Sequence, residues 1–181
     1  AYFRSSATFV LDNAGGLSNT TFNQTLNLGD ILYEENRDFV VESRNGFGLT
    51  VNSYSVNGGN NSQDVINRIE GGGLLTITGD YSGNNDTGNR LYRFEDNGDT
   101  LITGGFMVGA GGNKTLHKDG IGTLTIAGTN TNFVDVVDLV RGTIAITDFD
   151  SLGSGSTDTI RMSDEDIGLG GTAPACLLYT S

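Results

Sequence analysis

A repeated turn and strand constrains the fold of this chain more than any other feature. The segment IEGGGLLTITG at residues 69–79 aligns with KDGIGTLTIAG at residues 118–128, so that turn glycines and a Leu-Thr-Ile core recur. A single copy of this unit has no partner for its apolar face, and such units become stable by stacking on their neighbours. The repeat therefore predicts a stack of similar layers.

Looser copies of the strand divide the interval into shorter steps. A repeat of 20–26 residues, with Gly and Asn between the strands, predicts one rung of a β-solenoid rather than a propeller blade of about 40 residues. The first apolar residues of successive copies are separated by 26, 26, 23, 20 and 23 residues; they are Leu49, Leu75, Leu101, Leu124, Ile144 and Ile167.

Alternation within these strands predicts two faces. We expect the aliphatic side chains to point inward and the threonines between them to point outward. The expected inner rows are Leu49, Leu75, Leu124 and Ile144, and Val51, Ile77, Ile126 and Ile146; the expected outer row is Thr50, Thr76 and Thr125.

Further apolar groups at residues 39–41, 90–94, 105–108 and 134–140 indicate two or three strands per rung. Residues 57–64 and 80–89 are interpreted as long loops, and only residues 62–70 combine a capping residue with helical spacing. We interpret residues 1–175 as one domain, in which residues 46–171 contain the clearest rungs and residues 1–45 fit the period poorly.

Charge and hydropathy exclude two classes of partner. The formal net charge is −12, which would repel nucleic acid. The longest apolar runs fall far short of the roughly 20 residues that a membrane-spanning helix needs. We therefore expect no nucleic-acid partner and no membrane insertion by this segment.

Both ends of the sequence look like boundaries that are not natural ones. The first residues contain neither an initiator Met nor a signal sequence, which is typical of an internal fragment. The codons TGT CTC TTA TAC ACA TCT would encode Cys176–Ser181, and they match a transposon end used to tag DNA for sequencing. We interpret residues 176–181 as a non-native tail; without it, the region has no cysteine.

Residues 118–153 resemble the passenger-associated β-strand repeat of bacterial autotransporters. The matching elements are K-x-G-x-G-T-L-T-I-x-G-x-N-T from Lys118 to Thr131, an aromatic residue at 133, R-G-T-I at 141–144 and S-L-G at 151–153. DVVD at 135–138 departs from the family's usual Gly-Gly-Thr-Thr turn. The residues assigned to the structural repeat are Gly71, Gly73, Leu75, Ile77, Gly120, Gly122, Leu124, Ile126, Gly128, Phe133, Gly142, Ile144, Ile146, Leu152 and Gly153.

The resemblance implies a right-handed parallel β-helix in an exported passenger, located at the cell surface or outside the cell. Such a segment would be a structural stalk that supports adhesion and export, and the parent protein would continue into an outer-membrane barrel. A surface glycan or host molecule would be its ligand. The repeat brings no catalytic residue, so the resemblance implies neither enzyme activity nor a cofactor.

The residues offer little for other chemistry. His117 is the only histidine, so no histidine-based metal cluster or catalytic relay can form, and a solvated or turn position is expected for it. The glycines at 71–73 and 109–112 are not followed by the helix that a phosphate-binding loop requires. They are interpreted as rung corners.

Clustered carboxylates support an alternative, a carbohydrate-active or carbohydrate-binding β-helix, with or without Ca²⁺. Residues 58–66 only approach the calcium-binding nonapeptide. The candidate side chains are Asp80 and Asp86, then Glu95, Asp96 and Asp99, and finally Asp164, Glu165 and Asp166. Basic residues Lys114, Lys118 and Arg141 are expected beside corners.

Overall fold

A computed structural model gives the architecture of the chain. It describes residues 2–3, 7–11, 26–27, 30–34, 37–43, 48–57, 64–70, 73–84, 89–108, 113–129, 136–152, 159–162 and 175–179. Nearly all of these residues lie in short strands, and the one helix among them is a 3-10 turn, η1 (Phe149–Leu152). The prediction of an all-β fold is confirmed.

The strands form three sheets, and every strand pair in them is parallel. Sheet A contains β1 (Tyr2–Phe3), β4 (Asp30–Glu34), β7 (Ser53–Asn57), β10 (Tyr81–Asn84) and β13 (Phe106–Val108). Sheet B contains β2 (Ala7–Leu11), β5 (Arg37–Ser43), β8 (Asp64–Glu70), β11 (Arg90–Glu95), β14 (Lys114–Asp119), β16 (Val136–Leu139) and β18 (Thr159–Met162). Sheet C contains β3 (Leu26–Asn27), β6 (Gly48–Val51), β9 (Leu74–Ile77), β12 (Asp99–Ile102), β15 (Thr123–Ile126), β17 (Gly142–Ile146) and β19 (Ala175–Tyr179).

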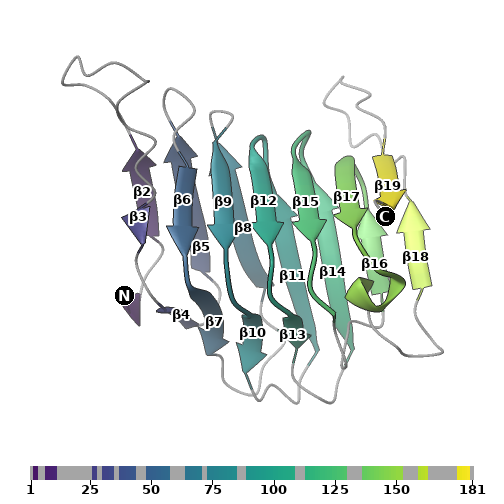
Figure 1. The fold of residues 1–181 in the computed structure, drawn as a ribbon, viewed down its shortest axis with the longest axis horizontal. Helices are drawn as coiled ribbons and strands as arrows, with labels where there is room; N and C mark the ends of the chain where they lie inside the picture. Colours follow the sequence, from purple (N-terminus) through teal and green to yellow (C-terminus); the bar gives the residue numbers. More distant parts are fainter. Residues whose placement is uncertain are drawn as a thin grey trace.

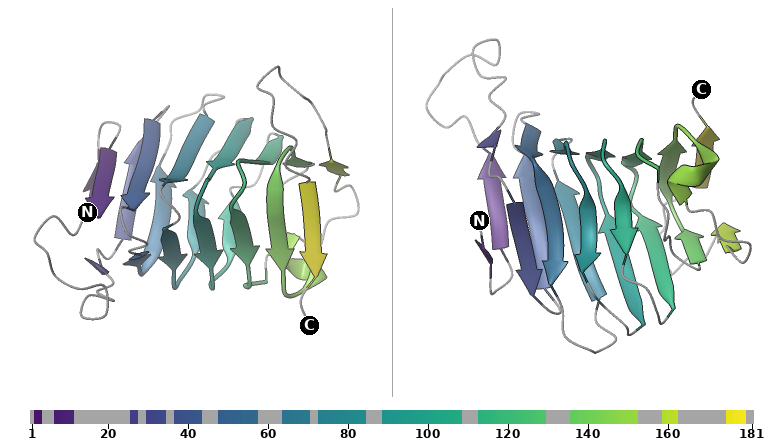
Figure 2. Two further views of the ribbon diagram at one scale, coloured as in Figure 1. Left: turned by 90° about the horizontal axis from the view of Figure 1, so that it is seen from above. Right: turned by 60° about the horizontal axis from the view of Figure 1, so that its bottom comes forward.

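Consecutive strands belong to different sheets; each strand from β1 to β12 pairs with the strand three places further along the chain, and each strand from β14 to β17 pairs with the strand two places further. We call one passage through sheets A, B and C a rung. Figure 1 shows the sequence colours advancing along the long axis of the molecule, with strands that run across it. The two further views in Figure 2 show the same progression, so successive rungs lie side by side.

The interior rows of sheet C follow the alternation of the sequence. Leu49 pairs with Leu75, and Leu124 pairs with Ile144; all four side chains are fully buried. The second row joins buried residues in register and consists of Val51, Ile77, Ile102, Ile126 and Ile146. These rows match the expected ones, because branched and aliphatic side chains on one face of each strand can be buried only by the neighbouring rungs.

One residue of the repeat was assigned wrongly. Leu101 is the first apolar residue of its copy in the sequence, but in the sheet Thr100 occupies the position between Leu75 and Leu124. Thr100 is buried, whereas Leu101 is half-buried on the outer face. The register is fixed by Ile102, which must point inward to continue the row of Ile77 and Ile126, and the period of two then places Leu101 outside.

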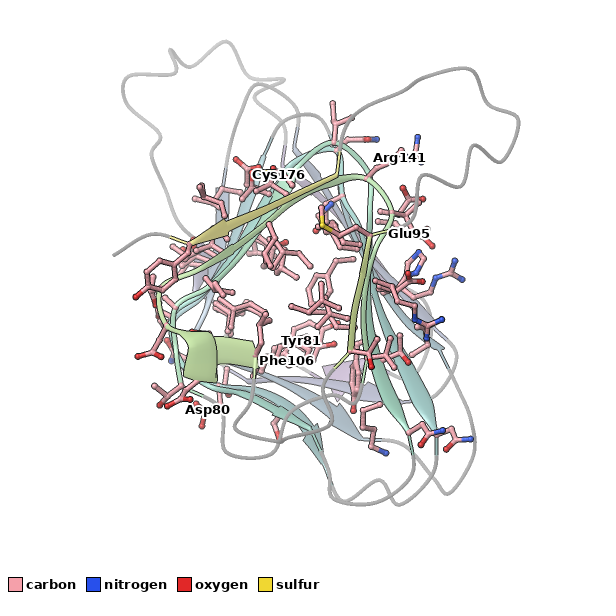
Figure 3. All side chains as sticks on the ribbon, turned by 90° about the vertical axis from the view of Figure 1, so that its right-hand side faces the viewer. Asp80, Tyr81, Glu95, Phe106, Arg141 and Cys176 are labelled. Atoms are coloured by element: carbon pink, nitrogen blue, oxygen red, sulfur yellow. The ribbon has the colours of Figure 1, made fainter. Side chains whose placement is uncertain are left out.

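Sheet A contributes an aromatic row to the core. The rings of Tyr54 and Tyr81 stack with their centroids 4.7 Å apart, and those of Tyr81 and Phe106 stack at 4.6 Å. Tyr92 and Phe94 of sheet B contact this row edge-on or tilted. Figure 3, seen along the long axis, shows Tyr81 and Phe106 inside the space that the sheets surround.

One segment with helical spacing forms a strand, and one local prediction is corrected. Residues 64–70 form strand β8, although residues 62–70 have helical spacing. The segment expected as a long loop, 80–89, contains strand β10 with a fully buried Tyr81. In both cases pairing with the neighbouring rungs outweighs local propensity, since β8 pairs with β5 and β11, and β10 with β7 and β13.

The last strands of sheets B and C leave apolar side chains uncovered. Ile160 and Met162 are in register with the buried Val137 and Leu139, yet they are exposed. β19, which includes Cys176 and three further residues of the interpreted tail, pairs with β17. Cys176 is exposed and is a free thiol.

Candidate functional site: the corner between sheets B and C

Two of the acidic side chains considered as candidates for a carbohydrate or calcium site bind backbone N–H groups. Asp80 Oδ1 accepts a hydrogen bond from the backbone N–H of Gly105 at 2.8 Å, and Asp99 Oδ1 accepts one from Thr123 at 2.8 Å. In both pairs the donor belongs to the next rung. The carboxylates therefore extend the backbone ladder at places where the strands end.

Other polar side chains act in the same way. Asn89 Oδ1 accepts from the backbone N–H of Asn113 at 2.8 Å, again in the next rung. Thr103 and Thr147 donate from their hydroxyl groups to carbonyl oxygens of the preceding rung, those of Thr78 and Ala127, each at 2.9 Å. Polar residues outside the strands thus tie the rungs to one another.

The most elaborate arrangement is at the turns that lead from sheet B to sheet C. We call residues 96–98, 120–122 and 140–141 of three successive rungs the B–C corner. Its first residue, Asp96, is fully buried, and its Oδ2 accepts a hydrogen bond from Thr100 Oγ1 at 3.1 Å. Backbone bonds join Asp96 N to Asp119 O at 3.0 Å and Gly122 N to Asp96 O at 2.9 Å. The backbone of Asp96 therefore belongs to the hydrogen-bond ladder that joins neighbouring rungs.

A fully buried lysine lies against this corner. Lys118 Nζ donates to the carbonyl oxygens of Asp119 and Gly120, at 2.8 and 2.9 Å. Burial lowers the pKa of Lys118, and the nearby carboxylates of Asp96, Asp119 and Asp99 oppose that shift. The ammonium group thus provides hydrogen bonds to a turn whose carbonyl groups point into the interior.

Outside the same turn, an ion pair holds two rungs together. Arg141 approaches Asp119 with Nε 2.5 Å from Oδ1 and Nη2 3.1 Å from Oδ2, and Oδ1 also accepts from the backbone N–H of Gly120 at 2.7 Å. These bonds lower the pKa of Asp119, with the hydrogen bond from Arg141 as the largest cause. Gly120 and Gly142 have φ values of 89° and 80°, a region that favours glycine.

The Asp119 contacts predict a specific loss of stability in acid. Because the folded-state pKa lies below its ordinary value of 3.8, the carboxylate contributes stability above that value, and the contribution is lost as the pH falls through the folded-state pKa. We expect Asp119→Asn to lower the free energy of unfolding at pH 7 and to reduce its fall below pH 3.8. Urea titrations from pH 2 to 7 measure this, and Asp150→Asn, at an exposed position, is the control. Equal acid dependence in all three proteins would contradict the prediction.

His117, for which a solvated or turn position was expected, lies in strand β14 and is half-buried. Its Nδ1 is 3.3 Å from Asp138 Oδ2 on the neighbouring strand β16. Arg93 and Glu95 form another pair on this outer face of sheet B, with Nε 3.0 Å from Oε1. The outer face of sheet B therefore carries the Arg93–Glu95 ion pair and a polar contact between His117 and Asp138; Figure 3 shows Glu95 and Arg141 on the outside of the sheets.

The described residues among those assigned to the structural repeat lie in the core or at its corners. Within the described ranges, those that are buried are Gly73, Leu75, Ile77, Gly120, Gly122, Leu124, Ile126, Gly142, Ile144, Ile146 and Leu152, and Gly128 is half-buried. Gly71, Phe133, Gly153 and Ile167 lie outside the described residues, as do the candidates Asp86, Asp164, Glu165 and Asp166 and the glycines at 109–112.

No three His, Cys, Asp or Glu side chains in the described part of the chain gather closely enough to hold a metal ion. No helix there has the length and hydropathy needed to span a membrane. The carboxylates of Asp80, Asp96, Asp99 and Asp119 bind backbone N–H groups, a hydroxyl group or a nearby guanidinium group. The arrangement provides hydrogen-bond partners for the turns, both from side chains of the same rung and from those of a neighbouring rung.

Sequence reasoning placed Lys118 and Arg141 beside corners but missed the burial of Lys118. Burial of Lys118 could have been predicted from the alternation of residues 114–119, because Lys118 lies on the same face of the strand as Leu116. Asp96 follows the end of β11, but it continues the alternation of the buried Tyr92 and Phe94, so the same signal was present there.

Comparison with protein-family models gives no match. Comparisons with curated proteins and with solved structures give no significant match either.

Proposed function

We propose that this chain is a segment of a right-handed parallel β-helix that serves as the stalk of a secreted or surface-displayed bacterial passenger of the autotransporter type. Its role is to hold an adhesive region away from the cell and to keep the passenger competent for export. The ligand of that region is a surface glycan or a host molecule. The stalk itself requires neither a cofactor nor catalysis.

The main observation in support of this proposal is that side chains of one rung contact the next rung. Interior rows, corner ladders and the Arg141–Asp119 pair all join one rung to the next. A chain built this way is quasi-one-dimensional, because each layer contacts only its neighbours and can be added to a preceding one. Rigidity and stepwise folding are the properties that an exported stalk needs.

The positions of the acidic side chains favour the stalk over a carbohydrate-active protein. A glycoside-cleaving site requires two carboxyl groups that both reach the sugar. Asp96 is fully buried, and Asp80 and Asp99 each bind the backbone of the next rung. The resemblance of residues 118–153 to the passenger-associated repeat supports the same conclusion.

Surface display tests the proposal. The chain is placed between an export signal and an outer-membrane anchor in a Gram-negative bacterium, and intact cells are treated with protease. We expect a surface-exposed, protease-resistant fragment for the unmodified chain and for Thr125→Asp, which points outward. Leu124→Asp puts a charge into an interior row and should abolish resistance.

Two results would overturn the proposal. One is rapid degradation of the displayed unmodified chain, because a stacked stalk should resist protease. The other is turnover of a polysaccharide from a test panel that is lost in Asp99→Asn, a substitution that retains an oxygen able to accept from Thr123. The second result would replace the stalk with a carbohydrate-active enzyme.

A further inference from the structure

The B–C corner contains an Asn-Gly dipeptide, formed by Asn97 and Gly98. Asn97 is exposed and Gly98 is buried, and both lie in the turn between β11 and β12, within the sequence Asp-Asn-Gly-Asp at 96–99. Glycine has no side chain to hinder its own backbone nitrogen. Asn-Gly is for this reason the dipeptide in which attack of the backbone on the side-chain amide is least obstructed.

We propose that Asn97 is a site of spontaneous deamidation whose product opens the B–C corner. The backbone nitrogen of Gly98 loses its proton and forms a bond to Cγ of Asn97. The bond from Cγ to Nδ2 breaks, and ammonia leaves with that proton, which gives a five-membered succinimide. Water then adds to one of the two ring carbonyls, and the ring opens to aspartate or isoaspartate. Water is the only co-reactant.

The structure indicates why isoaspartate would be harmful here. Opening toward isoaspartate routes the main chain through the side chain and lengthens it by one methylene group. At this corner the rungs are in direct backbone contact, since a Cβ placed on Gly122 would overlap the carbonyl group of Gly98. Asp99 N is also bonded to Gly73 O of the preceding rung at 2.9 Å, so the turn is held on both sides. An extra backbone atom cannot fit without displacing a neighbouring rung.

The product also adds charge where charge is already concentrated. A carboxylate at residue 97 would lie between Asp96, which is buried, and Asp99. Of the two effects, lengthening of the main chain belongs only to isoaspartate, whereas the added charge belongs to both products. The two can be separated by mutation, and neither depends on the proposed stalk role.

The experiment ages the purified full chain at pH 8.5 and 37 °C. Peptide mapping by mass spectrometry follows the conversion of amide to acid at residue 97 and separates aspartate from isoaspartate. Asn97→Gln is the unreactive control. It retains the other Asn-Gly pairs at 45–46 and 57–58, so any effect of their deamidation on the Tm is the same in the aged chain and in the aged control. Asn97→Asp carries the charge without the longer backbone.

We expect isoaspartate to accumulate at residue 97 and the Tm of the aged chain to fall by roughly 5 °C relative to aged Asn97→Gln. Fresh Asn97→Asp should lose less than half of that. The inference is overturned if the folded chain forms no product at residue 97 while the urea-unfolded chain does. It is also overturned if the product forms and the Tm does not change.

Discussion

Gly122→Ala is expected to lower the free energy of unfolding by at least about 3 kcal/mol, at the upper end of what overpacking costs. A Cβ at this position would overlap Gly98 O and would also come within 3.2 Å of Asp96 O. Both obstacles are backbone atoms of the preceding rung, and Asp96 O accepts a hydrogen bond from Gly122 N, so relief requires two rungs to separate. Urea denaturation followed by circular dichroism measures the loss.

Gly48→Ala is the matched control for this prediction. Gly48 is the first residue of β6, as Gly122 directly precedes β15 of the same sheet, but the nearest atom to a Cβ added at Gly48 is Leu74 O at 3.2 Å, which a shift of a few tenths of an ångström accommodates. We expect it to change stability by less than about 1 kcal/mol, since alanine also restricts the unfolded chain. Equal losses at Gly48 and Gly122 would show that the rungs are not in close backbone contact.

Lys118→Met is expected to cost roughly 3–5 kcal/mol, the usual effect of removing one member of a buried set of charges. Methionine fills a similar volume, but it leaves the carbonyl groups of Asp119 and Gly120 without their ammonium donor. It also removes the cation that favours the charged form of buried Asp96. The measurement is again urea denaturation at pH 7.

The double variant Lys118→Met with Asp96→Asn tests this explanation. If the uncompensated Asp96 carboxylate causes part of the loss, neutralising it should recover at least about 1 kcal/mol relative to the single variant. A double variant as unstable as the sum of the two single changes would contradict the explanation. Lys114→Met, at another buried lysine of β14, shows how much of the loss is specific to the B–C corner.

The titration of Lys118 gives an independent check. Its pKa is lowered in the folded chain, so between that value and the ordinary 10.5 the unfolded chain binds more protons at this site. The contribution of Lys118 to stability must then rise with pH over this alkaline interval. We expect the difference in stability between the unmodified chain and Lys118→Met to grow there.

The layered β architecture could be predicted from the sequence because apolar residues alternate with a period of two, which is also the period at which side chains alternate between the two faces of a strand. Leu75 and Ile77, like Leu124 and Ile126, could be assigned to the interior from alternation alone. The assignment failed at residues 100–102, where two adjacent apolar residues offer two possible registers. Only the pairing with neighbouring rungs, and a hydroxyl bond from Thr100 to Asp96, decides between them.

The corner could not be predicted in the same way, because its chemistry depends on residues from three rungs. Lys118 and Asp96 are ordinarily surface residues, and their types argue for exposure. The corner also depends on contacts between residues more than twenty positions apart, namely the backbone bond from Asp96 to Asp119 and the ion pair of Arg141 with Asp119. Local patterns carry no information about such contacts.

The orientation of the ladders has a mechanical consequence. Strands run across the long axis in Figure 1, so the hydrogen bonds between rungs point along it. A pull on the two ends would load these bonds in tension and would peel the terminal rung first, one ladder at a time. The side-chain ties at Asp80, Asp99 and Arg141 point in the same direction and would bear the same load. Resistance to stretching would then be set by the weakest single junction between rungs and would not increase with the length of the stack.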